Sequence, residues 1–250
     1  MRTTPLSWRI IQGIQQRLMV SKNIGIRKTQ NRIINQVTGE IIYTPPEARE
    51  IPDLISNLEK FIHDESIRLD PLVCAGLVHY QFEAIHPFPD GNGRTGRILI
   101  VLQLIQLGIL NLPKLYIRGC INRHRETYYK FLNKISFQVG WVPSIQFMLE
   151  AFLSQALETI KVLFDILSLF LELKEIFKDR FPNIARSNML ETIFSHPVIA
   201  PVKLGELLNV HYTTATKYLT ELREARILHD LISGKYHFYL NHRLLGVLSK

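Results

Sequence analysis

The most informative stretch of this 250-residue chain is His86-Pro87-Phe88-Pro89-Asp90-Gly91-Asn92-Gly93-Arg94-Thr95-Gly96-Arg97. It joins two apolar segments whose apolar residues recur at spacings of three and four, as the buried faces of helices require. Its twelve residues include a histidine, a carboxylate, three glycines and two arginines. Glycines permit tight turns and let backbone N–H groups approach a ligand. This combination indicates a ligand-binding loop between two helices.

Phosphate is the ligand that suits this loop best. A helix that begins near Arg94 offers its free N–H groups and the positive end of its dipole to an anion. Arg94 and Arg97 lie three residues apart on the first turn, so both can reach one polyphosphate. Asp90 supplies a hard oxygen ligand, which suits a magnesium ion shared with that phosphate. Histidine titrates near neutral pH, so His86 is a candidate general base.

Two other phosphate-binding motifs are excluded by their context. The segment 91–96 also matches the dinucleotide pattern GxGxxG, which requires a preceding strand and an acidic residue about 20 positions later. Here the preceding segment has the helical pattern, and no Asp or Glu occurs between Arg97 and Arg125. A Walker-type loop is excluded because no Lys-Ser or Lys-Thr pair follows the glycines.

The helical periodicity continues through most of the chain, so we expect a mainly α fold. One exception is the segment 31–46, where isoleucines and Tyr43 flank a Thr38-Gly39 turn and Pro45-Pro46 ends the run. This pattern is typical of a small β-hairpin. Helices are predicted at 52–64, 71–85, 94–108, 123–138 and 144–178.

A domain boundary is predicted at Phe181-Pro182-Asn183, which gives domains of 1–182 and 183–250. Three helices followed by a hairpin, the order predicted for the second domain, are the layout of a winged helix-turn-helix. Such a domain binds DNA or protein, and both remain open here, because Lys217 is the only fully charged residue among the recognition-helix candidates at 211–217. The predicted helices are 186–195, 203–208 and 212–225, and the strands are 227–232 and 236–240.

Composition excludes several classes of protein. The chain has 46% apolar and 21% charged residues, which is ordinary for a globular protein. Its two cysteines, Cys74 and Cys120, cannot build a disulfide framework or a four-cysteine zinc site. No run of about 18 apolar residues occurs, so we expect a soluble cytoplasmic protein without membrane contact. The net charge of +8 is compatible with phosphate-bearing partners.

Residues 86–97 resemble the HPFx(D/E)GNGRxxR signature of the Fic family, enzymes that transfer AMP from ATP to hydroxyl groups of proteins. The similarity extends to 43–46, 80–85, Asn122-Arg123, Tyr128-Tyr129 and the C-terminal domain, and so covers nearly the whole chain. It implies a Fic-type helical bundle at 1–182 with a β-hairpin flap at about 31–46, followed by a winged-helix domain at 183–250. The flap of this family presents the target segment through strand-like pairing.

The resemblance also implies roles for the matching residues. His86 would deprotonate the target hydroxyl, and Asp90 would hold Mg²⁺ at the α and β phosphates of ATP. For Tyr128 and Tyr129, a place beside the nucleoside and a packing role both remain open. The implied ATP-binding residues are Gly91, Asn92, Gly93, Arg94, Thr95, Gly96, Arg97 and Tyr129.

The implied reaction transfers AMP to a Tyr, Thr or Ser hydroxyl of a target protein and releases pyrophosphate. Gly93 favours AMP transfer over phosphate transfer, because relatives that phosphorylate carry a lysine there. Self-modification and a homodimer remain open. The alternative function is a DNA-binding regulator whose Fic core senses nucleotide without catalysing transfer.

Two features depart from the family pattern. The inhibitory pattern [ST]xxxE[GN] is absent, since no Glu is followed by Gly or Asn, and detectable activity is therefore expected without mutation. Arg226 stands where relatives commonly have glycine. The remaining histidines are expected to be structural rather than metal ligands: His63, His79, His196, His229, His237 and His242.

Overall fold

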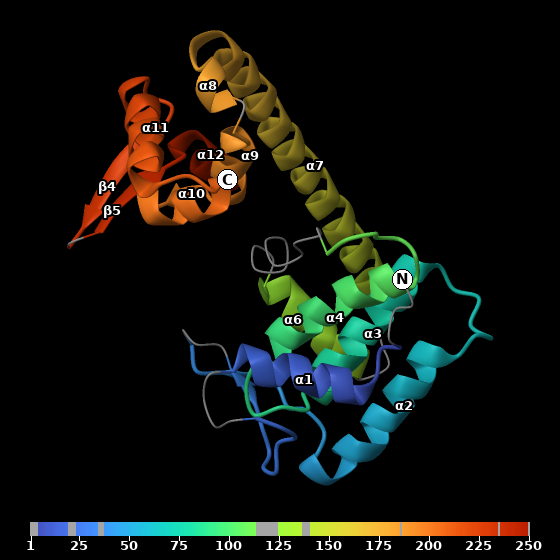
Figure 1. Ribbon diagram of the computed structural model, residues 1–250. Coiled ribbons are helices and arrows are strands. Elements are labelled where there is room, and N and C mark those ends of the chain that lie inside the picture. The colour runs from blue at the N-terminus through green and yellow to red at the C-terminus, as the bar shows by residue number, and fades with distance from the viewer. Residues whose placement is uncertain are drawn as a thin grey trace. The chain divides into compact units, whose positions relative to one another are not determined.

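A computed structural model describes residues 5–19, 24–34, 38–113, 125–136, 141–185, 187–234 and 236–249. The prediction of a mainly α fold is confirmed, since 66% of the described residues are helical (Figure 1). Residue contacts divide the chain into an N-terminal unit, 1–157, and a C-terminal unit, 158–250. The domain limits of 1–182 and 183–250 stay a prediction. None of the described helices combines the length and the apolar character that crossing a bilayer requires.

The N-terminal unit is a bundle of helices with a two-stranded hairpin. The helices expected from the apolar periodicity are present within three residues of their predicted ends, whereas α1 was not predicted. Asn122, Arg123 and Cys120 lie outside the described residues. The elements are α1 (Trp8–Leu18), β1 (Ile33–Ile34), β2 (Ile41–Tyr43), the 3₁₀ turn η1 (Ala48–Glu50), α2 (Ile51–His63), α3 (Pro71–Ile85), α4 (Asn92–Gln106), α6 (Arg125–Ser136) and the first part of α7 (Trp141–Arg180).

Helices α3 and α4 form the centre of the N-terminal unit. Asp70 caps α3 by accepting a hydrogen bond from the Leu72 N–H at 2.8 Å, and Pro71 occupies the first helical position, where its missing N–H is not needed. Both helices are buried on several sides and contribute to two apolar clusters. Their rigid packing fixes the loop between them, which carries residues 86–91.

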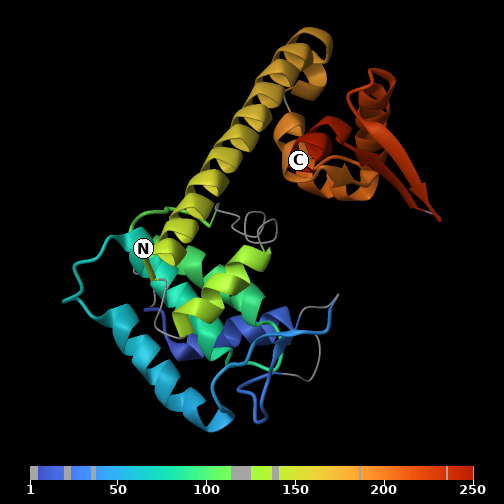
Figure 2. The same cartoon turned by 180° about the vertical axis from the view of Figure 1, so that it is seen from behind.

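The hairpin pairs β1 and β2 in antiparallel fashion, with Ile33 opposite Tyr43 and Ile34 opposite Ile41. Ile34 and Ile41 are half-exposed, whereas Tyr43 is buried and donates its hydroxyl hydrogen to the Ala84 carbonyl at 3.0 Å. The segment that carries these strands and helix α2 lie at opposite edges of the bundle (Figure 2). Tyr43 thus anchors the hairpin to the end of α3.

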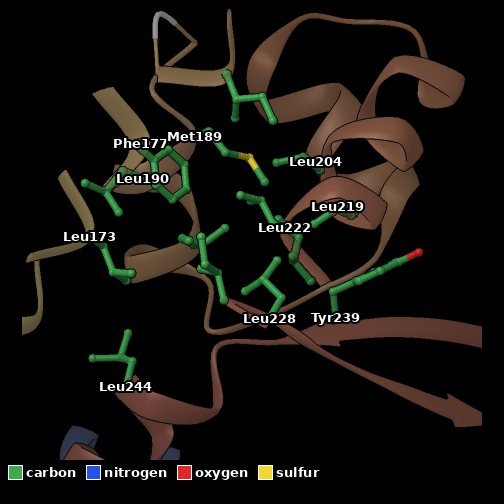
Figure 3. Packing of buried hydrophobic residues seen from close by; sticks show 14 of the residues in the cluster. Leu173, Phe177, Met189, Leu190, Leu204, Leu219, Leu222, Leu228, Tyr239 and Leu244 are labelled. Atoms are coloured by element: carbon green, nitrogen blue, oxygen red, sulfur yellow. The ribbon is translucent and has the colours of Figure 1, made fainter. Parts of the chain in front are cut away.

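The C-terminal unit combines helices with a small antiparallel sheet of strand order β3-β5-β4. Its core joins residues of the second half of α7, including Leu173 and Phe177, to Leu204, Leu219 and Tyr239 (Figure 3). Strand β3 and the helices α8 and α12 were not predicted. The elements after α7 are α8 (Pro182–Ala185), α9 (Met189–Ser195), β3 (Val198–Ile199), α10 (Pro201–Leu208), α11 (Tyr212–Glu224), β4 (His229–Ser233), β5 (Tyr236–Leu240) and α12 (His242–Leu248).

Arg226, which departs from the family pattern, follows the end of α11. Its φ is +59°, in the left-handed region where glycine is favoured, and its N–H donates to the Arg223 carbonyl at 2.9 Å. The arginine therefore adopts the conformation that a glycine would take at this helix end.

Candidate active site

The loop between α3 and α4 is held in shape by an internal clasp. The Asn92 side chain accepts a hydrogen bond from the Phe88 N–H at 2.9 Å and donates one to the Phe88 carbonyl at 2.8 Å. Phe88 is fully buried and stacks on Trp8, with 5.3 Å between ring centroids. Since both polar ends of the Asn92 amide are satisfied within the loop, this side chain shapes the site and leaves ligand binding to the backbone.

The start of α4 provides an anion-binding site. The first hydrogen bond of the helix runs from the Thr95 N–H to the Gly91 carbonyl, at 2.9 Å. The N–H groups of Asn92, Gly93 and Arg94 precede this bond, so the helix itself supplies no acceptor for them. The first turn carries no acidic residue. Three free donors and the positive end of the helix dipole suit phosphate oxygens.

Both arginines lie at this helix end. Arg94 is half-exposed and donates to the Leu18 carbonyl at 3.4 Å, and its guanidinium lies 3.8 Å from the carboxylate of Asp90. Arg97 is partly buried, with its Nη1 only 3.3 Å from the point that a Cβ on Gly93 would occupy. Gly93 therefore leaves room beside Arg97, and two cations flank the free N–H groups.

Asp90 is the residue available to a metal ion. One of its oxygens accepts the Gly91 N–H at 2.6 Å, and its side chain is 63% exposed. No group of three or more His, Cys, Asp or Glu side chains that could hold a metal occurs in the described part of the chain. Magnesium retains water ligands and is often bound by one carboxylate together with substrate phosphates. Asp90 fits this kind of site, in which substrate supplies most ligands.

His86 has the protonation state and tautomer of a general base. Its Nδ1 lies 3.3 Å from the Glu83 carbonyl, which can only accept, so the hydrogen is placed on Nδ1 and the lone pair on Nε2. Burial lowers the pKa of His86 to about 4, although the hydrogen bond to the Glu83 carbonyl opposes this shift. The imidazole is therefore neutral at physiological pH.

A buried polar layer lies beneath the first turn of α4. A Cβ on Gly96 would lie 2.3 Å from Glu83 Oε1, so only glycine permits this approach of α3 and α4. Thr95 is fully buried as well. Burial raises the pKa of Glu83 to about 7, and the nearby Arg97 opposes this rise. Thr95 and Gly96, both predicted to bind ATP, thus lie on the face of α4 that packs against the protein interior.

The two tyrosines of α6 differ in burial. Tyr128 is buried, and its hydroxyl lies 3.0 Å from Nε2 of His79. Burial lowers the pKa of His79 to about 4. Tyr129 is partly buried, with its ring centroid 5.5 Å from that of Tyr128. A nucleoside-binding role of Tyr129 stays a prediction, whereas Tyr128 packs against α3.

The structure thus brings His86, Asp90, Gly91, Asn92, Gly93, Arg94 and Arg97 together around one helix end. It also adds two buried residues that the sequence reasoning missed. Gln15 donates to the Asp90 carbonyl at 3.2 Å and accepts the Gly25 N–H at 3.3 Å. Arg27 donates to the His86 carbonyl at 2.9 Å. Neither residue lies in a periodic pattern or motif that sets it apart from other polar residues of the sequence.

Comparisons with known proteins show similarity in sequence family and in fold. Residues 5–104 match a model described as the Fic/DOC family, and residues 169–244 match one described as "Protein adenylyltransferase SoFic-like, C-terminal domain". The crystal structure of a Fic family protein from Desulfovibrio desulfuricans G20 is similar in fold, with a TM-score of 0.55 and 22% identity, covering 92% of this chain and 67% of that chain.

Two curated relatives are similar in sequence over shorter stretches. A probable protein adenylyltransferase of Aquifex aeolicus is 36% identical over 92 residues, which cover 37% of this chain and 26% of that protein. The protein adenylyltransferase Fic of Culex quinquefasciatus is 34% identical over 91 residues, which cover 36% of this chain and 17% of that protein. The match therefore spans about a quarter of these relatives' length or less.

Proposed function

The chain belongs to the Fic/DOC family, and on that premise we propose that it transfers AMP from ATP to a Tyr, Thr or Ser hydroxyl of a target protein. The observation that carries this proposal is a neutral histidine, His86, with Nε2 available to accept a proton, six residues before a helix end built to bind phosphate. A base and an anion site on one short loop are what nucleotidyl transfer to a hydroxyl requires.

Substrate binding relies on the start of α4. The N–H groups of Asn92, Gly93 and Arg94 and the guanidinium groups of Arg94 and Arg97 would hold the phosphates of ATP. These groups are fixed before substrate arrives, because the Asn92 clasp sets the loop and the α3–α4 packing sets the helix. Preorganised donors stabilise the charge that develops on the phosphate in the transition state.

In the chemical step, Nε2 of His86 takes the proton of the target hydroxyl. The hydroxyl oxygen forms a bond to the α phosphorus as the bond to the bridging oxygen of pyrophosphate breaks. The hydrogen bond from Nδ1 to the Glu83 carbonyl holds the ring orientation and stabilises the imidazolium that forms. A magnesium ion at Asp90 would neutralise charge on the phosphates when bound.

Transfer of AMP, rather than of phosphate, is tested with labelled ATP. The purified chain is incubated with target extract, magnesium and either α- or γ-labelled ATP, beside the His86→Ala variant and an EDTA control. The matched control is His211→Ala, which changes a histidine of the C-terminal unit. We expect label from the α position only, dependent on His86 and magnesium and unaffected by His211→Ala. Label from the γ position, or label independent of His86, contradicts the proposal.

For the C-terminal unit we propose a winged helix-turn-helix. Support comes from the close joining of α10 and α11, where a Cβ on Gly205 would lie 2.9 Å from the Val210 carbonyl oxygen, and from the β4–β5 hairpin that follows. Lys217 on α11 lies 4.0 Å from the carboxylate of Glu221, which reduces the positive charge that DNA phosphates require. We expect only weak, salt-sensitive binding to duplex DNA, measurable by fluorescence anisotropy over a salt series.

A further inference from the structure

Arg27 is a buried cation that has no carboxylate partner among the described residues. Arg27 is only 3% exposed, and it takes part in none of the ion pairs among the described residues. Its guanidinium donates instead to backbone carbonyls: to His86 from Nε at 2.9 Å, to Thr29 from Nη1 at 3.1 Å, and to Pro46 and, at 3.5 Å, Ile85 from Nη2.

Two of these carbonyls, those of Ile85 and His86, lie where α3 ends. The last carbonyls of a helix accept no hydrogen bond from within the helix, and they carry the negative end of its dipole. Here four consecutive carbonyls, at 84–87, accept hydrogen bonds from the segment that contains the hairpin. Tyr43 donates to Ala84, the Arg27 side chain to Ile85 and His86, and the Arg27 N–H to Pro87 at 2.9 Å. The helix end thus serves as the counter-charge that a buried arginine needs.

The same guanidinium also joins the two ends of the hairpin. Thr29 precedes β1 and Pro46 follows β2, so the two carbonyls at the base of the hairpin and the carbonyl of His86 are bound to one rigid planar group. His86 itself has a φ of +49°, a left-handed conformation that non-glycine residues adopt only when their surroundings impose it. Arg27 supplies a contact to the carbonyl of this strained residue.

We propose that Arg27 is a positioning residue for the transfer reaction, which holds His86 in its left-handed conformation and couples the base of the hairpin to the catalytic base. This inference rests on the proposed function. Through Arg27, the position of the hairpin base determines the position of the His86 backbone and hence of its imidazole. A displaced hairpin therefore moves Nε2 out of alignment with the target hydroxyl. The requirement is for the fork of the guanidinium, because the compact ammonium of lysine cannot reach several carbonyls in fixed directions.

The test compares Arg27→Lys with Arg49→Lys, a change of an exposed arginine paired with Glu47 just after the hairpin. Both retain positive charge. The kcat for AMP transfer is expected to fall by about 100-fold in Arg27→Lys, since small misplacements of a reacting group cost this much. Affinity for a non-cleavable ATP analogue is expected to stay within about twofold, because the hydrogen bonds of Arg27 go to residues 29, 46 and 85–87 and not to the N–H groups at the start of α4. Arg49→Lys is expected to match the unmodified chain in both measurements.

A second readout does not depend on activity. With ¹⁵N-labelled histidine, the His86 signals are identified by their loss in His86→Ala. The charged and titratable groups that face His86 are Arg27, Asp90 and Glu83. In Arg27→Lys we expect loss of the single Nδ1–H tautomer and a changed midpoint of His86 titration. This signature distinguishes the two proposals: if the unmodified chain does not transfer AMP, the proposed function fails while the His86 spectra still decide the coupling.

An unchanged kcat together with an unchanged His86 spectrum in Arg27→Lys overturns the inference. So does an equal loss of ATP-analogue affinity and kcat, which indicates general damage to the fold. If Arg27→Lys does not fold, Tyr43→Phe replaces it, since this change removes the hydroxyl that donates to the Ala84 carbonyl and keeps the buried ring. A severalfold fall in kcat with a shifted His86 signal then supports the coupling, and behaviour like that of the unmodified chain overturns it.

Discussion

Replacing Gly96 by alanine tests whether the contact between α3 and α4 requires a glycine. The added Cβ would lie 2.3 Å from Glu83 Oε1 and 3.1 Å from Phe82 Cδ1. Carbon and oxygen normally stay about 3.3 Å apart, so the buried carboxylate has to move by about 1 Å. Overpacking of this kind costs about 1–3 kcal/mol, and the better helix propensity of alanine returns up to about 1 kcal/mol. We therefore expect a net destabilisation of about 1–2 kcal/mol.

Urea unfolding followed by tryptophan fluorescence measures this loss, because both tryptophans, Trp8 and Trp141, belong to the N-terminal unit. Gly93→Ala is the matched control, since its Cβ would meet the flexible tip of Arg97 at 3.3 Å and Glu83 Oε1 at an ordinary contact distance of 3.9 Å, and no loss of stability is expected. In a Glu83→Ala background the 2.3 Å clash disappears and only the 3.1 Å contact with Phe82 Cδ1 stays, so Gly96→Ala is expected to cost clearly less stability there. Equal destabilisation in both backgrounds refutes the steric explanation.

Three further predictions follow from single residues. Because burial lowers the pKa of His86 to about 4, the rate of AMP transfer is expected to stay constant from about pH 8 to about pH 5 and to fall toward pH 4, which initial rates over pH will show. The folded-state pKa of Glu83 is raised from 4.5 to about 7, so the protonated carboxyl stabilises the fold below about pH 4.5 and this stabilisation is lost as the pH rises to 7. Glutamine does not titrate. The free energy of unfolding of Glu83→Gln, measured in urea, is therefore expected to rise relative to that of the unmodified chain by up to about 3 kcal/mol between these pH values. Arg226→Gly relieves about 1–2 kcal/mol of left-handed backbone strain, whereas the more flexible unfolded chain costs about 0.4–1 kcal/mol. Thermal unfolding of the C-terminal unit should therefore show a net gain in stability of about 0.5 kcal/mol. A loss of stability in this variant contradicts the presence of strain at Arg226.

The sequence predicted the helices and the loop at 86–97 because both depend on local patterns. Helical periodicity reports which face of a segment is buried, and it placed α3 at 71–85 and α11 within one residue of their observed ends. The loop was found because its residues lie within one short segment of chain. Strand β3 and the helices α8 and α12 were missed; β3 and α8, with two and four residues, are too short for a periodic pattern to emerge.

The sequence did not predict what lies around the loop. Arg27 and Gln15 bind the backbone of residues that are 59 and 75 positions away. Every residue has a backbone carbonyl, so such a contact does not require a particular residue type at the partner position and cannot be recognised in the sequence. Gly96 and Thr95 were assigned to ATP because the motif is continuous in sequence, yet successive helical residues point in different directions. The hydrogen bonds of the Asn92 side chain were also not predicted, because their partner is the backbone of Phe88.

Helix α7 has a consequence for how this chain can be divided. Its first half contributes Met148 and Phe152 to the core of the N-terminal unit, and its second half contributes Leu173 and Phe177 to that of the C-terminal unit. The similarity to the C-terminal family model likewise begins at residue 169, inside the helix. Recombination at the Phe181-Pro182 turn would therefore separate the C-terminal module from core residues such as Leu173 and Phe177. The C-terminal module can be inherited as a folding unit only together with the second half of α7.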